Sequence, residues 1–275
     1  MQQPGILYVV ATPIGNAGDI SARAIETLRQ VDAICAEDTR HSGQLLARLG
    51  IQRPMLALHD HNEEAQSAQL VQRLLAGQSL ALVSDAGTPL VSDPGFRLVR
   101  AVREAGLRVS PVPGPSALIA ALSVAGLPSD RFVFEGFLPA RPKARRERLQ
   151  FLAGEPRTLI FYESSHRIEE TLADATGVFG GDRQAVVARE LTKLFETVLE
   201  GTLVELAARV ANEADQRKGE FVVLIEGAGE DADAQLAEGR RVHALLAREL
   251  PPSKAAKLAA EITGAPRRAL YGAAD

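Results

Sequence analysis

The sequence contains a single cysteine, Cys35, and no tryptophan. One cysteine cannot form an intramolecular disulfide or a zinc cluster, and its place in the apolar run 31–36 indicates a buried thiol. Aromatic residues make up only 4% of the chain, which disfavours a stacking platform for single-stranded nucleic acid. No stretch approaches 18 apolar residues, and no basic start leads into a long apolar run. We therefore expect a cytoplasmic protein without a membrane partner.

The chain has 275 residues, of which 46% are hydrophobic and 24% are charged. This composition is typical of globular proteins and argues against wholesale disorder. The length is sufficient for two domains, because domains usually have roughly 100–200 residues. The net charge of −4 gives no overall indication of nucleic-acid binding.

In the first half, short apolar runs alternate with helical patterns, which predicts βαβ crossovers and a mostly parallel sheet buried on both faces. We expect strands at 6–10, 34–36, 55–58, 80–84 and 109–112, and helices at 21–29, 66–76, 94–105 and 116–125. Ser21 and Ser116 are expected at helix N-caps.

The second half has longer spacings and fewer crossovers, which favours a mixed sheet. We expect strands at 132–137, 158–162, 185–190 and 221–226, and helices ending near 152 and at 165–178 and 204–211. Tail helices at 235–249, 253–263 and 266–271 have a helix-turn-helix layout. The predicted fold class is therefore α/β, with domains at 1–127 and 128–228 and a helical tail at 235–275.

Three turns at predicted strand ends carry the strongest functional signals, because ligands bind outside the carboxyl ends of strands in open α/β sheets. They are 11–16, 84–95 and 112–117, and each is rich in glycine or proline. The second turn is longer than the usual βα connection, which is typical of a binding loop. Within it, Asp93 and Pro94 are explained by a helix start, with Asp93 as the cap and Pro94 at the first position.

Three other motifs are weaker. The segment 227–232 fits a Gly-x-Gly-x-x-Ala fingerprint, but its acidic residues would repel a pyrophosphate and no strand follows. His59 and His61 could share a face of an extended segment, yet no third metal ligand has a suitable spacing, so no metal is expected. The segment 163–167 offers serine and histidine without the turn that a hydrolase nucleophile requires.

Basic residues are concentrated in two segments of this acidic chain. Residues 141–148 hold five basic residues and one acid, and residues 239–275 hold seven basic residues and three acids. Such segments are either solvated helix faces or contacts for phosphate groups.

Taken together, the segments 7–21, 36–40, 84–95, 112–117, 162–167, 188–193 and 218–226 resemble the ribosomal RNA small-subunit methyltransferase I family, in the tetrapyrrole methylase-like superfamily. The resemblance covers about residues 6–226, and the short, Ala-rich tail resembles the family's C-terminal helix-turn-helix. It implies an S-adenosyl-L-methionine-dependent enzyme, usually a homodimer. The implied reaction is 2′-O-methylation of a cytidine ribose in the decoding region of 16S rRNA, within the small ribosomal subunit.

The resemblance also implies that the methyl donor lies in a cleft between the two domains. The implied donor-binding residues are Pro13, Ile14, Gly15, Asp85, Gly87, Thr88, Pro89, Ser116 and Ala117 from the first domain, and Phe161, Tyr162, Ala188 and Arg189 from the second.

A ribose hydroxyl is a weak nucleophile, so a general base would assist the transfer. Glu37, Asp38 and His59 are the candidates near strand ends, although Asp38 could equally cap a helix. Planar guanidinium groups suit phosphate binding, and the predicted RNA-binding residues are Arg40, Arg141, Lys143, Arg145, Arg146 and Arg167. Methylation of a tetrapyrrole or a protein side chain by the same fold, or RNA binding without catalysis, remain alternatives.

Overall fold

The computed structural model describes residues 3–59, 61–229 and 232–270. The chain forms two compact units, of which the larger extends to Glu226 and the smaller begins at Gly227 and also includes Gly154–Arg157. No helix in the described ranges is both long and apolar enough to cross a membrane.

The first sheet of the larger unit is entirely parallel, with strand order β3-β2-β4-β1-β5. Its strands are β1 (Ile6–Val10), β2 (Ala33–Ala36), β3 (Met55–Ala57), β4 (Leu80–Val83) and β5 (Arg108–Val112). The helices between them are α1 (Ala22–Gln30), α2 (Thr39–Arg48), α3 (Glu63–Leu75) and α4 (Phe96–Glu104), with a short 3-10 helix η1 (Ala17–Asp19). Ser21 caps α1 by accepting from the Ala24 amide, as expected.

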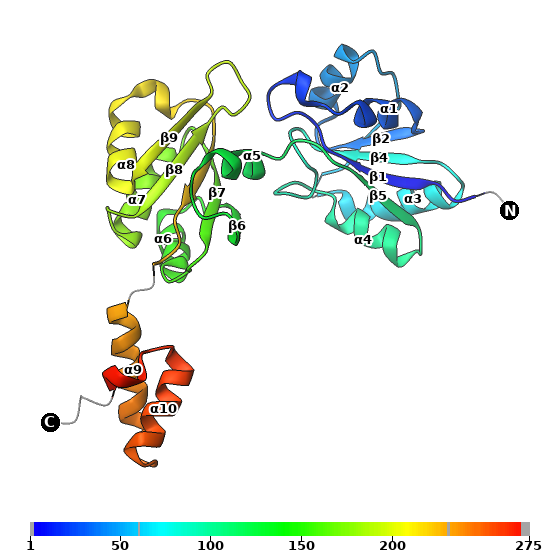
Figure 1. Ribbon diagram of the computed structural model, residues 1–275. Helices are drawn as coiled ribbons and strands as arrows, with labels where there is room; N and C mark the ends of the chain where they lie inside the picture. Colours follow the sequence, from blue (N-terminus) through cyan, green and yellow to red (C-terminus); the bar gives the residue numbers. More distant parts are fainter. Residues whose placement is uncertain (1–2, 60, 230–231, 271–275) are drawn as a thin grey trace. The chain divides into compact units, whose positions relative to one another are not determined.

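Both faces of this sheet are buried under helices (Figure 1). One face packs against α1 and α2 around Ile34 and Val83, and the other packs against α3 and α4 around Cys35 and Leu82. Successive residues of a strand point to opposite faces, so near-continuous apolar strands such as β2 and β4 are required here. Cys35 is buried, and burial raises the pKa of its thiol to about 12.

The second sheet is mixed, with strand order β6-β7-β10-β8-β9 and one parallel pair, β6 with β7. Its strands are β6 (Phe132–Phe137), β7 (Thr158–Ser164), β8 (Gln184–Arg189), β9 (Thr197–Thr202) and β10 (Glu220–Ile225). The associated helices are α5 (Ala117–Val124), α6 (Pro142–Leu152), α7 (Ile168–Phe179) and α8 (Leu203–Asn212), with a 3-10 helix η2 (Ala214–Arg217). The α/β fold class, with one parallel and one mixed sheet, is confirmed.

Helix α5 packs on the second sheet, although it precedes the domain boundary predicted at 127. Its buried residues Leu118 and Ala121 contact Ile160 and Val222, whereas α6, α7 and α8 cover the opposite face. The division into domains at 1–127, 128–228 and 235–275 stays a prediction.

Several expected elements differ from the observed ones. Helix α4 begins at Phe96 with Gly95 at the N-cap, so the interpretation of Asp93 and Pro94 as its cap and first residue was wrong. Gly95 has a φ of 126°, which glycine adopts readily. The loop therefore ends at Gly95, and no side chain caps the helix. Strand β9 and helix α2 were not expected, and Ser116 lies at the N-cap of α5 but makes no capping hydrogen bond.

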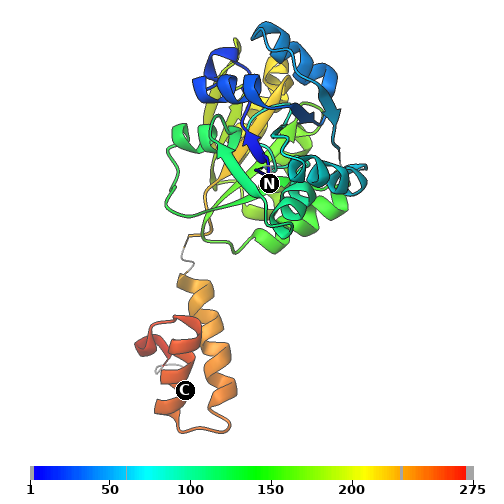
Figure 2. The same ribbon diagram turned by 90° about the vertical axis from the view of Figure 1, so that its right-hand side faces the viewer.

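The smaller unit contains α9 (Ala232–Leu246), α10 (Pro252–Thr263) and α11 (Arg267–Leu270), which Figure 2 shows from a second side. Small residues hold these helices together, with Ala256, Ala259, Ala265 and Leu270 fully buried. Gly264 ends α10 in the left-handed conformation typical of such caps. The expected helix end at Tyr271, and the acidic pair 230–231 of the Gly-x-Gly-x-x-Ala segment, lie outside the described residues.

Candidate functional site

The three predicted turns follow β1, β4 and β5, which are neighbours in the parallel sheet. Their carboxyl ends therefore meet at one edge, and hydrogen bonds join the turns there. The backbones of Thr12 and Gly87 exchange two hydrogen bonds, of 2.8 and 3.1 Å. The Thr88 hydroxyl donates to the Pro115 carbonyl at 2.9 Å. Gly87 has a φ of 84°, so the tight approach to the first turn requires glycine.

The second sheet and its loops contact the first turn and the start of α5. The Asn16 amide donates to the Thr192 hydroxyl at 3.2 Å, and the Leu118 amide donates to the Tyr162 hydroxyl at 3.2 Å. A Cβ atom at Gly15 would lie 2.4 Å from Cγ of Lys193, so a larger residue there would force the Lys193 side chain to move. The first βα turn and the loop between β8 and β9 are thus fitted closely together.

These turns and loops enclose a cavity of about 470 Å³, which is within the roughly 300–1,000 Å³ typical of small-molecule sites. Of the predicted site residues, the cavity is lined by Ile14, Glu37, Asp85, Gly87, Thr88, Ser116, Ala117, Tyr162 and Ala188. The structure therefore brings most of the predicted donor-binding residues to one place.

Five predicted donor-binding residues do not line the cavity: Pro13, Gly15, Pro89, Phe161 and Arg189. Phe161 points to the opposite face of the second sheet, into the core beneath α6 and α7, because adjacent residues of a strand alternate in direction. The Arg189 guanidinium is buried and donates to the Thr197 hydroxyl and to the carbonyl oxygens of Phe195 and Lys218. Arg189 thus fixes the loops beside the cavity.

The three predicted general bases have different surroundings. Glu37 lines the cavity. Asp38 caps α2, accepting from the Arg40 amide at 2.7 Å and the His41 amide at 3.2 Å, and these bonds lower the pKa of its carboxyl. His59 lies outside the cavity lining, with its ring centroid 6.1 Å from that of His61. Within the described ranges, no group of three potential metal ligands was found.

Asp93 is a cavity residue that the sequence reasoning assigned to a helix cap. Burial raises the pKa of its carboxyl to about 6, and the negative charges of Glu37 and Asp85 act in the same direction. A hydrogen bond with Ser84 opposes the increase. The unusual length of the loop that carries Asp93 was the available signal, because long loops at strand ends hold functional residues.

Lys193 is a second cavity residue that was not predicted. Its Nζ lies 2.8 Å from a carboxylate oxygen of Glu190 and 2.8 Å from one of Glu220. Burial alone would lower the pKa of Lys193, but the hydrogen bonds to these two carboxylates outweigh it and raise the pKa. The lysine therefore stays charged at neutral pH and keeps the loop between β8 and β9 against the start of β10.

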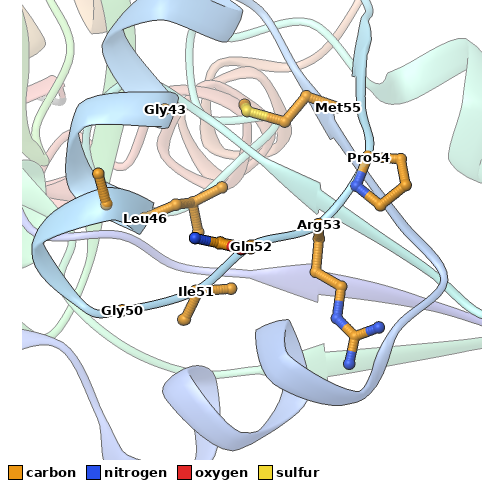
Figure 3. Close-up of a pocket in the computed structure, with 9 residues that line it drawn as sticks. Gly43, Leu46, Gly50, Ile51, Gln52, Arg53, Pro54 and Met55 are labelled. Atoms are coloured by element: carbon orange, nitrogen blue, oxygen red, sulfur yellow. The ribbon is translucent and has the colours of Figure 1, made fainter.

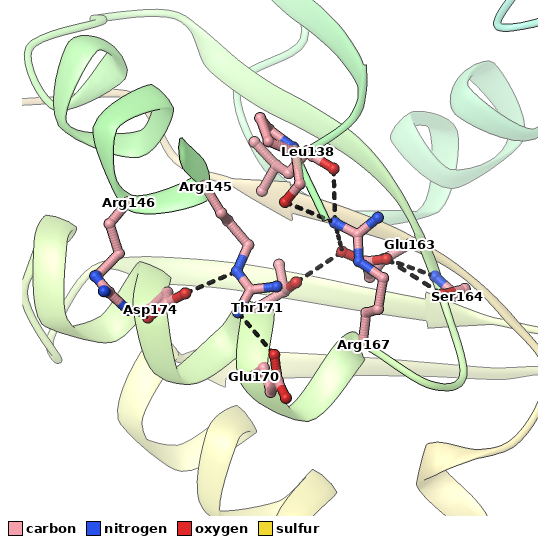
Figure 4. A network of polar contacts seen from close by, with 10 residues as sticks. Leu138, Arg145, Arg146, Glu163, Ser164, Arg167, Glu170, Thr171 and Asp174 are labelled. Atoms are coloured by element: carbon pink, nitrogen blue, oxygen red, sulfur yellow. Dashed lines mark hydrogen bonds and ion pairs between the residues drawn. The ribbon is translucent and has the colours of Figure 1, made fainter. Parts of the chain in front are cut away.

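A network of polar contacts begins at Glu163, which lines the cavity, and continues into the second sheet's helices (Figure 4). Glu163, at the end of β7, accepts from the Thr171 hydroxyl at 2.7 Å and pairs with Nη2 of Arg167 at 3.3 Å. The same Arg167 nitrogen donates to the carbonyl oxygens of Leu138, at 2.6 Å, and Pro139. The predicted RNA-binding residue Arg167 is therefore used to attach the loop after β6 to β7.

Arg145 is also committed to internal contacts (Figure 4). Its guanidinium lies 2.7 Å from Asp174 and 2.9 Å from Glu170, and only 2% of the side chain is exposed. This geometry argues against a phosphate contact by Arg145. The other predicted RNA-binding residues, Arg40, Arg141, Lys143 and Arg146, are exposed.

A second hollow of about 580 Å³ lies between the end of α2 and the start of β3 (Figure 3). It is at the amino end of β3, away from the strand ends where ligands bind in such sheets. Gln52 and Arg53 provide its polar side chains, and the Arg53 guanidinium donates to the Arg29 carbonyl oxygen. No carboxylate or nucleophile lines this hollow, so it offers no acid–base chemistry.

Comparison with known proteins agrees with this architecture. The family model of Tetrapyrrole (Corrin/Porphyrin) Methylases matches residues 6–207, and that of the RsmI C-terminal HTH domain matches residues 233–274. The fold is shared with solved structures of the methyltransferase CobJ (TM-score 0.60, 18% identity, 82% of this chain and 95% of that one) and of uroporphyrin-III-C-methyltransferase from Thermus thermophilus (TM-score 0.55, 19% identity, 81% and 94%).

Curated relatives are much more similar. The protein named ribosomal RNA small subunit methyltransferase I from Xylella fastidiosa strain Temecula1 is 68% identical over 99% of this chain and 100% of its own length. Proteins of the same name from Pseudomonas aeruginosa and Haemophilus influenzae are 57% and 53% identical, each over 97% of this chain and 95% of their own length. The chain belongs to the ribosomal RNA small subunit methyltransferase I family of the tetrapyrrole methylases.

Proposed function

We propose that this methyltransferase uses S-adenosyl-L-methionine to methylate the 2′-hydroxyl of a cytidine ribose in the decoding region of 16S rRNA. The observation that carries the proposal is the cavity at the joined carboxyl ends of β1, β4 and β5, in a chain of this family. The RNA substrate is 16S rRNA within the small ribosomal subunit, so we also place the enzyme in the cytoplasm.

The residues of the cavity fit such a donor. The site combines apolar contacts from Ile14, Val91 and Leu191 with the carboxylates of Glu37 and Asp85, which suit a ligand that carries positive charge. The start of α5, where Ser116 and Ala117 line the cavity, could hold the donor's carboxylate, because a helix N-terminus attracts anions. When bound, S-adenosyl-L-methionine supplies an activated methyl group on a sulfonium centre.

The chain's own contribution is mainly positioning. The turns at 11–16, 84–95 and 113–116 are fixed to one another by the hydrogen bonds described above, so the site is formed before a ligand arrives. Holding two reactants in line can contribute about 7–11 kcal/mol to catalysis. Tyr162 is held by the Leu118 amide and by edge-on contacts with Phe134 and Phe137, and it provides a rigid wall on the side of the second sheet.

The proposed RNA contacts are the exposed basic residues Arg40, Arg141, Lys143 and Arg146, together with the basic tail. We further propose a homodimer, because α5 carries an apolar outer face: Ile119 and Val124 are 51% and 55% exposed. The two solved methyltransferase structures named above share less than 20% identity with this chain, so that likeness supports the fold alone.

The test combines binding with transfer. Calorimetry should detect about one donor site per protomer, for S-adenosyl-L-methionine and for its demethylated product. Labelled donor should then methylate small ribosomal subunits rather than naked rRNA or a tetrapyrrole. Absence of donor binding by the folded protein would refute the proposed enzyme activity. Methyl transfer to the tetrapyrrole alone would refute the proposal that RNA is the substrate.

Two glycine variants make this test specific to the cavity. Gly87 and Gly106 both have positive φ, of 84° and 71°, so alanine strains both backbones similarly. A Cβ at Gly87 would approach Ile14 to 3.2 Å in the cavity wall, whereas Gly106 faces open space. Gly87→Ala should weaken donor binding by about tenfold or more, and Gly106→Ala should leave it unchanged. Equal effects would mean that the cavity is not the donor site.

A further inference from the structure

The cavity contains several groups that could accept a proton. Most of them are excluded as a general base because they already have charged or hydrogen-bonding partners. Glu190 pairs with Lys193, and despite the effect of burial these contacts lower the pKa of its carboxyl. Glu163 is buried and is used by Thr171 and Arg167. Lys193 is held in its protonated form by two carboxylates. Glu220 also lines the cavity and pairs with Lys193, so the carboxylates still to be considered there are Glu37, Asp85 and Asp93.

These three carboxylates come from two neighbouring strand ends. Glu37 follows β2, whereas Asp85 and Asp93 belong to the loop after β4. Asp85 accepts from the Asp38 amide at 3.3 Å, which ties it to the start of α2.

Asp93 has a different environment. Its carboxyl is partly buried, and Glu37 and Asp85 are close enough for their charges to disfavour its ionisation. Tyr162 faces it from β7, and the charge of Asp93 helps to raise the pKa of that phenol, after the larger effect of burial. The opposing hydrogen bond from Ser84 is shared, because the Ser84 hydroxyl has one hydrogen and also lies 3.1 Å from the Gly87 carbonyl oxygen.

The loop holds Asp93 in place at a cost in backbone strain. Leu90 and Ser92 have φ values of 73° and 66°, which are unfavourable for residues with a side chain. The loop is supported from the second sheet, since a Cβ at Gly136 of β6 would lie 3.0 Å from the Ser92 hydroxyl. Strain of this kind persists where the surrounding structure fixes a residue for a function.

From this arrangement we infer that Asp93 is the general base that takes the proton from the ribose hydroxyl, an inference that rests on the proposed function. The Asp93 carboxylate accepts the hydroxyl proton while the ribose oxygen forms its bond to the methyl carbon. The bond between that carbon and sulfur breaks, and its electron pair stays on the sulfur, which becomes neutral. The negative charge of Asp93 and the positive charge of the sulfonium are lost together.

The electrostatics suit this role. A base is most effective when its pKa is near the working pH, and the pKa of Asp93, at about 6, leaves it mostly ionised at neutral pH. Protonation of Asp93 also relieves its repulsion from Glu37 and Asp85. The proton is therefore accepted more readily than by an ordinary aspartate.

The test uses single-turnover methyl transfer to small ribosomal subunits, from about pH 5 to about pH 9, with the full-length chain. The wild-type rate should rise to a plateau with a midpoint near the pKa of Asp93, at about 6. Asp93→Asn should lower the plateau by about 10²-fold or more and remove the midpoint, with donor affinity within about threefold of wild type. Asp93→Glu should restore part of the rate, because it restores a carboxylate.

Glu37→Gln provides a second, independent readout. Removing its negative charge should shift the wild-type midpoint to lower pH, because that charge raises the pKa of Asp93. If Glu37→Gln removes the midpoint and Asp93→Asn keeps it, Glu37 is the base and the inference is wrong. Loss of donor binding in Asp93→Asn would instead make Asp93 a donor ligand. A wild-type enzyme that binds the donor but methylates none of the RNA substrates would refute the proposed function itself.

Discussion

Arg145 and Arg146 are adjacent on α6 but have different surroundings. Arg145 is buried between α6 and α7 and contacts Glu170 and Asp174, whereas the side chain of Arg146 is half exposed and lies 3.3 Å from Asp174. Burial follows the helical period, because Arg145, Leu149 and Leu152 are the buried residues of α6. The spacing of Arg145, Leu149 and Leu152 is visible in the sequence, and it could have been used to predict that Arg145 is buried while its neighbours are exposed.

This difference predicts opposite phenotypes for two alanine variants. Arg145→Ala should lower the free energy of unfolding by about 2–4 kcal/mol, because it leaves the largely buried Asp174 without its main partner. Arg146→Ala should cost less than about 1 kcal/mol, as exposed pairs do. Urea unfolding of the larger unit, followed by circular dichroism, measures both. A similar small loss in each would show that the Arg145 contacts are energetically unimportant.

Asp93 should affect stability with a pH dependence of known sign. Its pKa is raised from 3.8 to about 6 in the folded chain, so the folded state binds the proton more tightly than the unfolded state. Ionisation of Asp93 therefore reduces stability as the pH rises from about 4 to about 6, and the full cost persists above that range. Below about pH 4 the cost is absent.

Asp93→Asn removes this cost, so it should raise Tm by about 1–3 °C at pH 7.5 and leave it unchanged near pH 4. The partial exposure of Asp93 keeps the expected gain small, because solvent screens its interactions. Thermal melts of the two proteins at both pH values measure the difference. If the variant and the wild type had the same Tm at pH 7.5 as well as at pH 4, Asp93 would be an ordinary solvated carboxylate.

At the scale of elements, the parallel sheet and the three turns at its strand ends were predictable, because β1 and β4 are short apolar runs and the turns after β1, β4 and β5 are rich in glycine and proline. Strand β9 was missed because it is an edge strand in which only Leu199 is buried, so its sequence lacks a continuous apolar signal. Helix α2 was missed because its polar first turn hides the apolar positions. The sequence could not show whether Asp93 is a cavity residue or a helix cap, since an aspartate just before a helix is compatible with both roles.

Helix α5 is apolar except for the exposed Ser123, although only one side packs on the second sheet. Leu118 and Ala121 are buried there, and Ile119 and Val124 are exposed. A helix that is apolar on most sides is usually buried, so the exposed apolar residues of α5 form the proposed dimer contact. The proposed dimer contact and the cavity therefore share one helix, because α5 begins at the cavity wall with Ala117.

Replacing both Ile119 and Val124 by lysine should therefore convert the proposed dimer into monomers. Light scattering after size-exclusion chromatography measures the mass. The matched control is Leu75→Lys on α3, where the residue is 46% exposed and where no contact is proposed. A dimer that survives the double variant, or that dissociates in the control, would place the interface elsewhere.

For the whole molecule, the remaining question is whether the smaller unit contributes to RNA binding. Its helices are held together by small apolar residues such as Ala256 and Ala259, and its basic side chains point to solvent. Arg248, Lys254 and Arg268 are exposed, whereas Lys257 pairs with Glu261 within α10. If the exposed cations bind phosphate, each contact releases counterions and makes binding more sensitive to salt.

Changing Arg248, Lys254 and Arg268 together to glutamine should weaken binding to small subunits and reduce the slope of log affinity against log salt by about 2. The matched control removes three cations that already have acidic partners in the larger unit: Arg209, Arg217 and Lys218. Net charge falls equally in the two triple variants, so a general field effect would change both slopes alike. A reduction confined to the tail variant, with unchanged donor affinity in calorimetry, identifies direct phosphate contacts. Equal slopes in the tail variant and the wild type would leave these residues as a solvated surface and assign RNA binding to the larger unit, where Arg141, Lys143 and Arg146 are the next residues to test.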